Sequence, residues 1–206
     1  MDALLRDGLR MAYDKHMDEN TYVGFKTYET TGLVNNPDVV ITDASASGTG
    51  SSTKFADKTP DQILADINAA ILTAWAAAEY DLDAVPNHII MPYEQYNHLA
   101  TTKVTELAEK TILAFLLENN VAKQNGSDLF IGATAWCKGA AADGSSDRMV
   151  VYCNKERYLA MDELAPLTRA MTTPNTQQFC YDTAYAGNVS EVEVFYDQTI
   201  LYVDKI

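Results

Sequence analysis

The sequence predicts an α+β fold, because its helical segments come first and its strands follow. Residues 60–80 and 104–120 repeat apolar side chains at intervals of three and four, as helices with one buried face do. From Leu129 onwards the interval changes to two, and β-branched and aromatic residues dominate. Helices followed by a run of strands favour separate layers, so we expect long helices packed on mostly antiparallel sheets.

The composition limits the class of protein. A chain of 206 residues with 47% hydrophobic content can bury a core and most simply forms one domain. Its 29 acidic and 15 basic residues give a net charge of −14, which disfavours sequence-specific binding of nucleic acid and binding to anionic membranes. Cys137, Cys153 and Cys180 are odd in number and widely spaced, which suggests reduced, buried thiols in a cytosolic setting.

The N-terminal quarter of the chain is expected to be a helix followed by loops. The apolar spacing predicts a helix over residues 3–17, which the polar residues 18–20 end, and a short strand over 21–23. A short apolar run lies at 39–41. Residues 44–53 are all Ala, Ser, Gly or Thr, so we expect a surface loop there.

The helix over 60–80 has the clearest start signal in the chain. Thr59 can cap the first turn, Pro60 suits the first helical position, and Gln62 can complete a capping box with Thr59. A helix of this length spans about 30 Å, roughly the width of a small domain. A polar break then leads into residues 88–91, a candidate for a short buried strand.

The second half of the chain is expected to form the sheets. The predicted strands are residues 129–137, 148–152, 158–161, 178–185, 189–195 and 200–203. Residues 138–147 are rich in Gly, Ala, Ser and Asp, which is typical of a hairpin loop, and Gly187-Asn188 is expected to be a turn.

Two local clusters suggest chemistry, and neither has the spacing that the chemistry needs. His88, Glu94 and His98 do not match a metalloprotease helix, and Pro92 lies between them. The glycines of residues 48–52 lack the lysine of a phosphate-binding loop. The chain also has no Cys-x-x-Cys motif and no Gly-x-Ser-x-Gly nucleophile elbow. We therefore predict no catalytic, cofactor-binding or metal-binding residues and no enzymatic activity.

Short motifs occur along nearly the whole chain, and their order can be compared with that of a known protein family. They are the Gly-Leu-Val-Asn-Asn-Pro turn at 32–37, the Thr-Pro helix start at 59–67, the strand with a Pro-x-x-x-Tyr exit at 86–96, and the strand segments 147–152 and 187–203. In this order they resemble the major capsid proteins of tailed bacteriophages, which have the Hong Kong ninety-seven-type shell fold. The N-terminal helix would then resemble the long spine helix of that family.

The resemblance implies a structural protein, the major capsid subunit of a tailed phage or prophage. It implies one subunit over residues 1–206, with a peripheral lobe over about 1–58 and 178–206 that includes the spine helix, and an axial lobe over about 59–177. Copies would form pentamers and hexamers that close into the icosahedral shell of a virion, assembled in the bacterial host cytoplasm. The shell would enclose DNA without sequence-specific binding. Scaffold, protease and portal proteins would be partners, and no membrane and no cofactor would take part.

The resemblance also implies where subunits meet. Family members usually begin with an arm and an extended hairpin, and Met1 lies at or within the predicted spine helix, so this chain is expected to lack both. The loop 138–147 is the expected tip near the rotation axis, with Asp143, Asp147 and Arg148 as candidate contacts between subunits. Two alternatives stay open. An encapsulin-like compartment shell would show a groove for cargo peptides, and an unrelated α+β enzyme would show a deep pocket with convergent polar groups.

Overall fold

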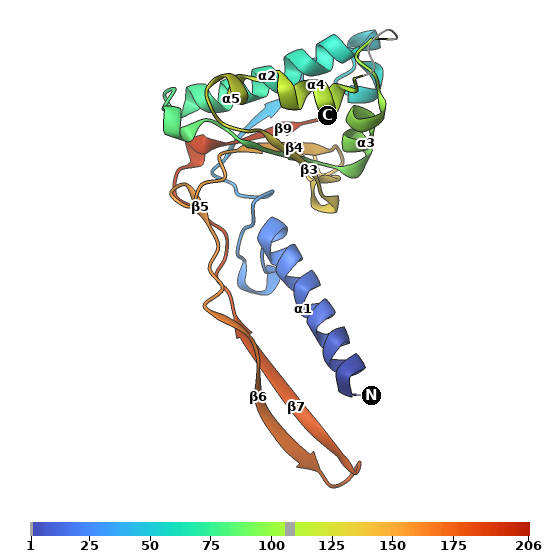
Figure 1. Cartoon of the computed structure of the whole chain (residues 1–206), viewed down its shortest axis with the longest axis vertical. Coiled ribbons are helices and arrows are strands. Elements are labelled where there is room, and N and C mark those ends of the chain that lie inside the picture. Colours follow the sequence, from blue (N-terminus) through green and yellow to red (C-terminus); the bar gives the residue numbers. More distant parts are fainter. Residues whose placement is uncertain (1, 106–109) are drawn as a thin grey trace. The chain divides into compact units, whose positions relative to one another are not determined.

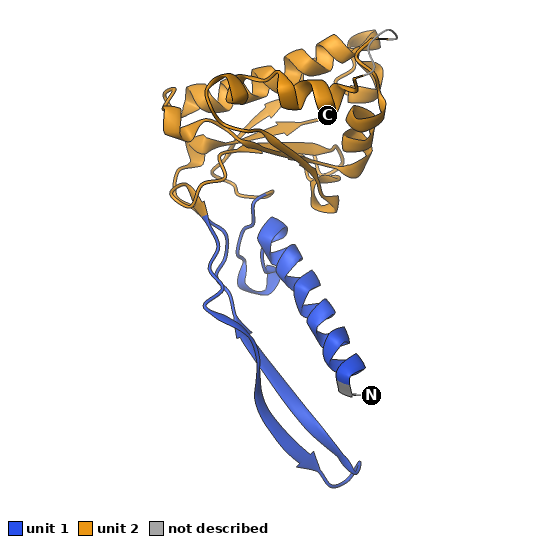
Figure 2. Cartoon of the chain, viewed as in Figure 1, with its two compact units in different colours: residues 1–33, 160–193 blue, residues 34–159, 194–206 orange. Residues whose placement is uncertain are grey.

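The computed structural model describes residues 2–105 and 110–206 and divides into two compact units (Figures 1 and 2). Unit 1 comprises residues 1–33 and 160–193, and unit 2 comprises residues 34–159 and 194–206. Each unit joins segments that are far apart in the sequence, so both depend on long-range contacts. No helix in the described part of the chain is long and apolar enough to cross a membrane.

Unit 2 is built on one five-stranded sheet. Its strands are β1 (Val40–Asp43), β2 (His88–Met91), β3 (Phe130–Ala133), β4 (Arg148–Tyr152) and β9 (Ile200–Asp204), in the order β1-β9-β4-β2-β3. Strand β4 is antiparallel to both of its neighbours, whereas the outer pairs β1–β9 and β2–β3 are parallel. The α+β class is confirmed, and the sheet of unit 2 is mixed, because each outer strand joins it through a long connection rather than a tight hairpin.

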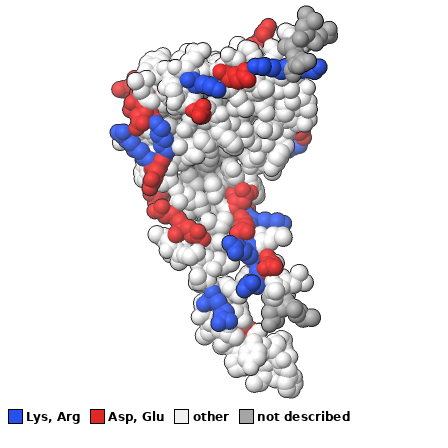
Figure 3. All heavy atoms as spheres, viewed as in Figure 1, with Lys and Arg blue, Asp and Glu red and all other residues white. Residues whose placement is uncertain are grey.

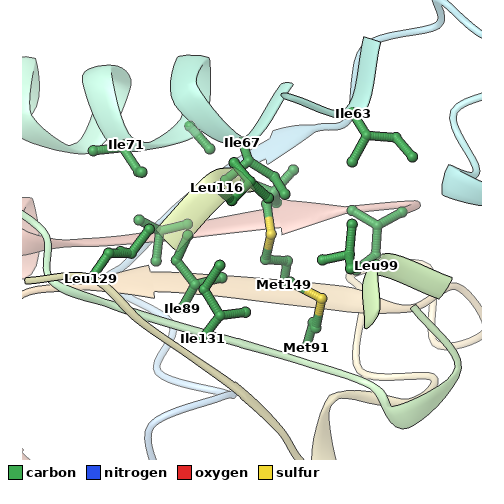
Figure 4. Close-up of a cluster of buried hydrophobic side chains, with 14 of the residues drawn as sticks. Ile63, Ile67, Ile71, Ile89, Met91, Leu99, Leu116, Leu129, Ile131 and Met149 are labelled. Atoms are coloured by element: carbon green, nitrogen blue, oxygen red, sulfur yellow. The ribbon is translucent and has the colours of Figure 1, made fainter. Parts of the chain in front are cut away.

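Helices cover one face of this sheet. They are α2 (Pro60–Ala77), α4 (Ile112–Glu118) and α5 (Val121–Gln124), while α3 (Tyr93–Thr101) lies at the end of the sheet (Figure 1). Figure 4 shows Ile63, Ile67 and Ile71 of α2 pointing at the sheet, where Ile89 and Met149 lie opposite. All five of these side chains are almost completely buried, so the predicted apolar face of α2 forms the main core.

The capping box predicted for α2 is present. The Thr59 hydroxyl accepts a hydrogen bond from the Gln62 N–H (3.4 Å), and the Gln62 Oε1 accepts one from the Thr59 N–H (2.9 Å). Two of the N–H groups that this helix start leaves unpaired are therefore satisfied by residues only three positions apart, and Pro60 has no N–H to satisfy.

We expect Thr59→Ala to lower the free energy of unfolding by about 1 kcal/mol, because it removes this cap. Urea unfolding of the monomeric chain measures the change. Thr101→Ala is the matched control, since that threonine is exposed at the end of α3 and its hydroxyl donates to the Asn97 carbonyl. A control variant that loses as much stability as Thr59→Ala would contradict the role of the cap.

Unit 1 contains the helix α1 (Asp2–Val23) and a hairpin of β6 (Ala165–Asn175) and β7 (Cys180–Asn188). The helix continues six residues beyond the predicted end, so the expected strand at 21–23 is wrong. Gly24 ends the helix with φ 79°, where a Cβ would lie 2.3 Å from the Thr30 carbonyl oxygen. The stop signal is therefore this glycine and not the polar residues before it.

Several other boundaries also differ from the prediction. Residues 138–147 do not form a hairpin loop, because β2 lies between β3 and β4. Strand β3 ends at Ala133, and β8 (Glu193–Val194), like β5 (Leu159–Ala160), has only two residues. The helix predicted over 104–120 begins at Ile112, and its part from 106 to 109 lies outside the described residues.

The hairpin in unit 1 is the largest difference. The expected turn at Gly187-Asn188 lies inside β7, and β6 was not predicted as a strand. Every residue of both strands is exposed except Leu167, Asn175 and Tyr185, which are half-buried. Because neither face is buried, the sequence shows no alternation of apolar and polar residues that would mark these strands.

Candidate functional site

The loop that was predicted to meet neighbouring subunits is organised by Asp143. The carboxylate of this exposed residue accepts hydrogen bonds from the Ser145 N–H (2.9 Å), the Ser146 N–H (2.7 Å) and the Ser146 hydroxyl (2.6 Å). Gly144, at φ 69°, allows the chain to fold back over the carboxylate. The tip of the loop thus has a defined shape and presents a negative charge to solvent.

These hydrogen bonds predict a dependence on pH. The Ser146 hydroxyl, with the N–H groups of Ser146 and Ser145, holds the pKa of Asp143 well below its usual value. A lowered folded-state pKa means that the ionised carboxylate stabilises the fold above about pH 4, and that this contribution is lost as the pH falls towards the lowered pKa. We expect the difference in stability between wild type and Asp143→Asn to shrink on acidification. Urea unfolding across the acidic range measures this difference, and a difference that stays constant would contradict the prediction.

Asp147 lies at the base of the same loop and ties it to α3. Its Oδ1 accepts a hydrogen bond from the Gly139 N–H (3.0 Å), and its Oδ2 accepts one from the Gln95 side-chain amide (2.7 Å). Both carboxylate oxygens are thus used within unit 2. The half-buried side chain fixes where the loop leaves the sheet.

Arg148 is buried under the loop and forms an ion pair with Asp204. Its Nε lies 2.6 Å from Asp204 Oδ1 and its Nη2 lies 2.9 Å from Oδ2, while Nη1 donates to the Val34 carbonyl (2.8 Å). The guanidinium carbon lies 4.3 Å from the centre of the Tyr202 ring. The exposed fractions of the Arg148 and Asp204 side chains are only 5% and 2%. Since its donors are engaged inside unit 2, Arg148 supports the loop from within.

The ion pair reaches the loop directly. Asp204 Oδ2 also accepts a hydrogen bond from the Ala142 N–H (2.8 Å), one residue before Asp143. The structure therefore brings Asp143, Asp147 and Arg148 together around one loop and gives each a different position, at its tip, at its base and beneath it. Contact with another subunit stays a prediction for all three.

A hollow of about 690 Å³ lies beside this loop. Its lining residues include Glu94, His98, Asp147 and Lys205. Glu94 is paired with Lys138 (2.5 Å) and Lys205 with Asp43 (2.6 Å), so these charges are directed to separate partners and not to one point in the hollow. The enzyme alternative requires polar groups that converge in a deep pocket, and these two charged side chains do not converge.

The other clusters considered in the sequence are structural in this fold. The His88 ring lies between two amides, with Nδ1 2.9 Å from Asn87 Oδ1 and Nε2 3.2 Å from Asn154 Nδ2. Among the described residues, no group of three or more His, Cys, Asp or Glu side chains could hold a metal ion. The segment 48–52 closes on itself through a hydrogen bond from the Gly48 N–H to the Ser52 carbonyl (2.9 Å).

The three thiols are not equivalent, which corrects the expectation that all of them are buried. Cys137 and Cys153 are buried, and burial raises the pKa of their thiols to about 12 and about 11, whereas Cys180 is exposed on the hairpin. We expect only Cys180 to react with a thiol reagent in the folded monomer, and all three to react in denaturant. Counting the labels by mass spectrometry tests this, and rapid native labelling of Cys137 or Cys153 would contradict it.

The feature that sequence reasoning missed is the hairpin surface. Phe179 at its turn is 95% exposed, Tyr181 is 75% exposed and Met171 is 60% exposed. In Figure 3 the tip of this hairpin is white, that is, without charged side chains. The available signal was the number of Thr and Tyr residues between 168 and 186, because both types favour strands even without alternation.

Comparisons with known proteins agree with this architecture. A model of the family described as "Major capsid protein" matches residues 2–206. Among solved structures the chain is similar to the capsid of Myoviridae phage XM1, with a TM-score of 0.81 and 21% identity, over 100% of this chain and 65% of that chain. It is also similar to a virus-like particle from Pyrococcus furiosus, with a TM-score of 0.56 and 14% identity, over 90% of this chain and 61% of that one. A search of curated proteins found no match.

The chain thus spans less than two thirds of the length of either solved relative. The two structural likenesses confirm the predicted capsid-type shell fold. The family match confirms the predicted class, that of the major capsid proteins. Since that match runs from residue 2 to residue 206, the chain belongs to the major capsid protein family.

Proposed function

We propose that this chain is a shell-forming subunit of a tailed-phage capsid and that its copies bind one another through the hairpin of unit 1. The observation that carries the proposal is the exposure of both hairpin strands. A two-stranded hairpin is at best marginally stable in water, because it has no core of its own. This one spans residues 165–188 with only three half-buried residues in its strands, so a partner surface would stabilise it.

The helix α1 supports the same proposal. Leu5 is 68% exposed and Leu9 is 39% exposed, although both lie on the face that the apolar spacing predicts to be covered. Exposed apolar surface on two elements of one unit is typical of a subunit whose core is completed by its neighbours.

The loop 138–147 is the second proposed contact, at the centre of pentamers or hexamers. Rings that close by rotation bring such tips against their own copies, and the exposed Asp143 carboxylate would then face a donor on the next copy. Asp147 and Arg148 would act by holding the loop in position. The axial lobe, over about 59–177, would contain this loop, and the peripheral lobe, over about 1–58 and 178–206, would contain α1.

The wider setting follows from the family. The proposed shell encloses DNA without reading its sequence, which suits a net charge of −14. Assembly would take place in the bacterial host cytoplasm, with scaffold, protease and portal proteins as further partners. The encapsulin-like alternative shares the assembly proposed here and differs in what the shell contains.

Light scattering over a concentration series, with negative-stain microscopy of the same samples, tests the proposal. We expect the wild-type chain to form rings or closed shells as its concentration rises. A variant in which Asn-Gly replaces residues 169–185 should stay monomeric, since it lacks most of the hairpin. Its unit 2 should still unfold cooperatively in urea, which controls for misfolding. A wild-type chain that stays monomeric at every concentration would overturn the proposal.

A further inference from the structure

The backbone conformation and the exposure of Phe179 are both unusual for an aromatic residue. Phe179 lies in the hairpin turn with φ 52°, in the left-handed region that favours glycine and asparagine and disfavours bulky side chains. Its side chain is also 95% exposed. Both the backbone and the apolar surface of this residue are unfavourable in an isolated subunit. An aromatic ring at this position is therefore best explained by a surface that receives it.

The charge of the hairpin indicates which kind of surface that is. Residues 165–188 contain one basic and one acidic residue, Arg169 and Asp182, so the hairpin is neutral. A neutral, aromatic tip has no cations with which to bind phosphate groups of nucleic acid or of lipids. It can approach a copy of this acidic chain without repulsion, and buried aromatic residues are the usual anchors of protein–protein interfaces.

Unit 2 has a hollow whose volume suits a phenyl ring and whose lining is largely apolar. The hollow has a volume of about 190 Å³ and lies between the end of β1 and the helix α2. Its lining includes the apolar or small side chains Ala44, Phe55, Ala70, Thr73 and Met149. A cavity of about 150 Å³ in a protein core binds benzene, so this hollow has room for one phenyl ring.

The acidic groups near the hollow do not oppose an apolar guest. Asp66, which also lines it, is paired with the buried Lys58 at 2.5 Å. Asp43 is paired with Lys205 at 2.6 Å. With both carboxylates engaged, the apolar lining is the surface left for a ligand.

We propose that Phe179 of one copy inserts into the hollow between β1 and α2 of a second copy. This inference rests on the proposed function and names the contact that would join the copies. The ring and the hollow belong to different surfaces, so the contact is head-to-tail, and a pair of copies keeps one free ring and one free hollow. Contacts of this type continue from copy to copy and generate rings or larger assemblies rather than closed dimers.

Two substitutions, one on each side of the contact, test the proposal. Phe179→Asn removes the ring and suits the left-handed backbone, so it preserves or improves the hairpin. Thr73→Trp fills the hollow from an exposed position of α2, and Ala76→Trp, also exposed on α2 but outside the hollow lining, is the matched control. We expect Phe179→Asn and Thr73→Trp each to weaken association in light scattering by roughly 30-fold or more, and Ala76→Trp to leave it unchanged.

A disulfide trap gives an independent readout. Cys180 is exposed next to Phe179. Thr73→Cys places a second exposed thiol at the hollow that is proposed to receive Phe179 of another copy. With diamide as the oxidant, we expect covalent dimers and higher species of Thr73→Cys on a non-reducing gel, and much less cross-linking of Ala76→Cys. Cross-linking should disappear when Cys180 is replaced by serine.

The outcomes separate this inference from the proposed function. In one outcome the wild type assembles, the variant with the shortened hairpin does not, and both Phe179→Asn and Thr73→Trp assemble normally. The hairpin contact then stands, and the insertion of Phe179 is overturned. If Phe179→Asn fails to assemble but Thr73→Trp does not differ from Ala76→Trp, the ring binds elsewhere and the proposed hollow is overturned. A wild-type chain that never associates overturns both.

Discussion

Asp204→Leu is expected to lower the free energy of unfolding by about 3–5 kcal/mol, the range found when one partner of a buried ion pair is removed. The substitution leaves the Arg148 guanidinium buried without its carboxylate. It also removes the acceptor of the Ala142 N–H at the base of the loop tip. The substitution therefore leaves three donors without an acceptor, the Arg148 Nε and Nη2 groups and the Ala142 N–H, which is the reason for the large effect.

Urea unfolding of the monomeric chain measures this change, with two comparisons. Asp43→Leu, which breaks the half-exposed pair with Lys205, should change stability very little. Combining Arg148→Met with Asp204→Leu should recover much of the loss, because neither charge is then left alone. The explanation fails if the double variant is less stable than Asp204→Leu by itself.

The second large effect is expected in the core beneath α2. Ile67→Ala should lower the free energy of unfolding by about 2–5 kcal/mol, because the side chain is 0% exposed and its removal leaves a cavity against the sheet. Leu72→Ala on the same helix is the matched control. Leu72 is 45% exposed, so its truncation should destabilise the chain far less. Similar losses for the two variants would mean that α2 is not packed on the sheet as described.

The sequence predicted elements whose signals are local or whose faces are buried. The start of α2 was predictable because Thr59, Pro60 and Gln62 act on one another within four residues. Strands β2, β4 and β9 were predictable because each is buried, and burial leaves a run of apolar residues in the sequence. The family resemblance succeeded for a related reason, since its motifs are helix starts, turns and buried strands.

The hairpin could not be predicted in this way. Strands β6 and β7 have no buried face, so their apolar and polar residues do not alternate, and Gly187 resembled a turn although it lies inside a strand. The end of α1 was missed because its stop depends on the close approach of the Thr30 carbonyl to Gly24. That contact exists only once the chain has turned back on itself.

The sequence alone determined the α+β class, the start and buried face of α2, and the resemblance to capsid proteins, because each depends on neighbouring residues or on which side chains avoid water. Only the tertiary structure decided the roles of Arg148 and Phe179. Arg148 meets a partner 56 residues away, and its position beside β9 follows from the order of strands in the sheet. Phe179 is exposed because the turn of the hairpin falls at that residue. Strand order and turn position come from long-range pairing, which no local pattern in the chain encodes.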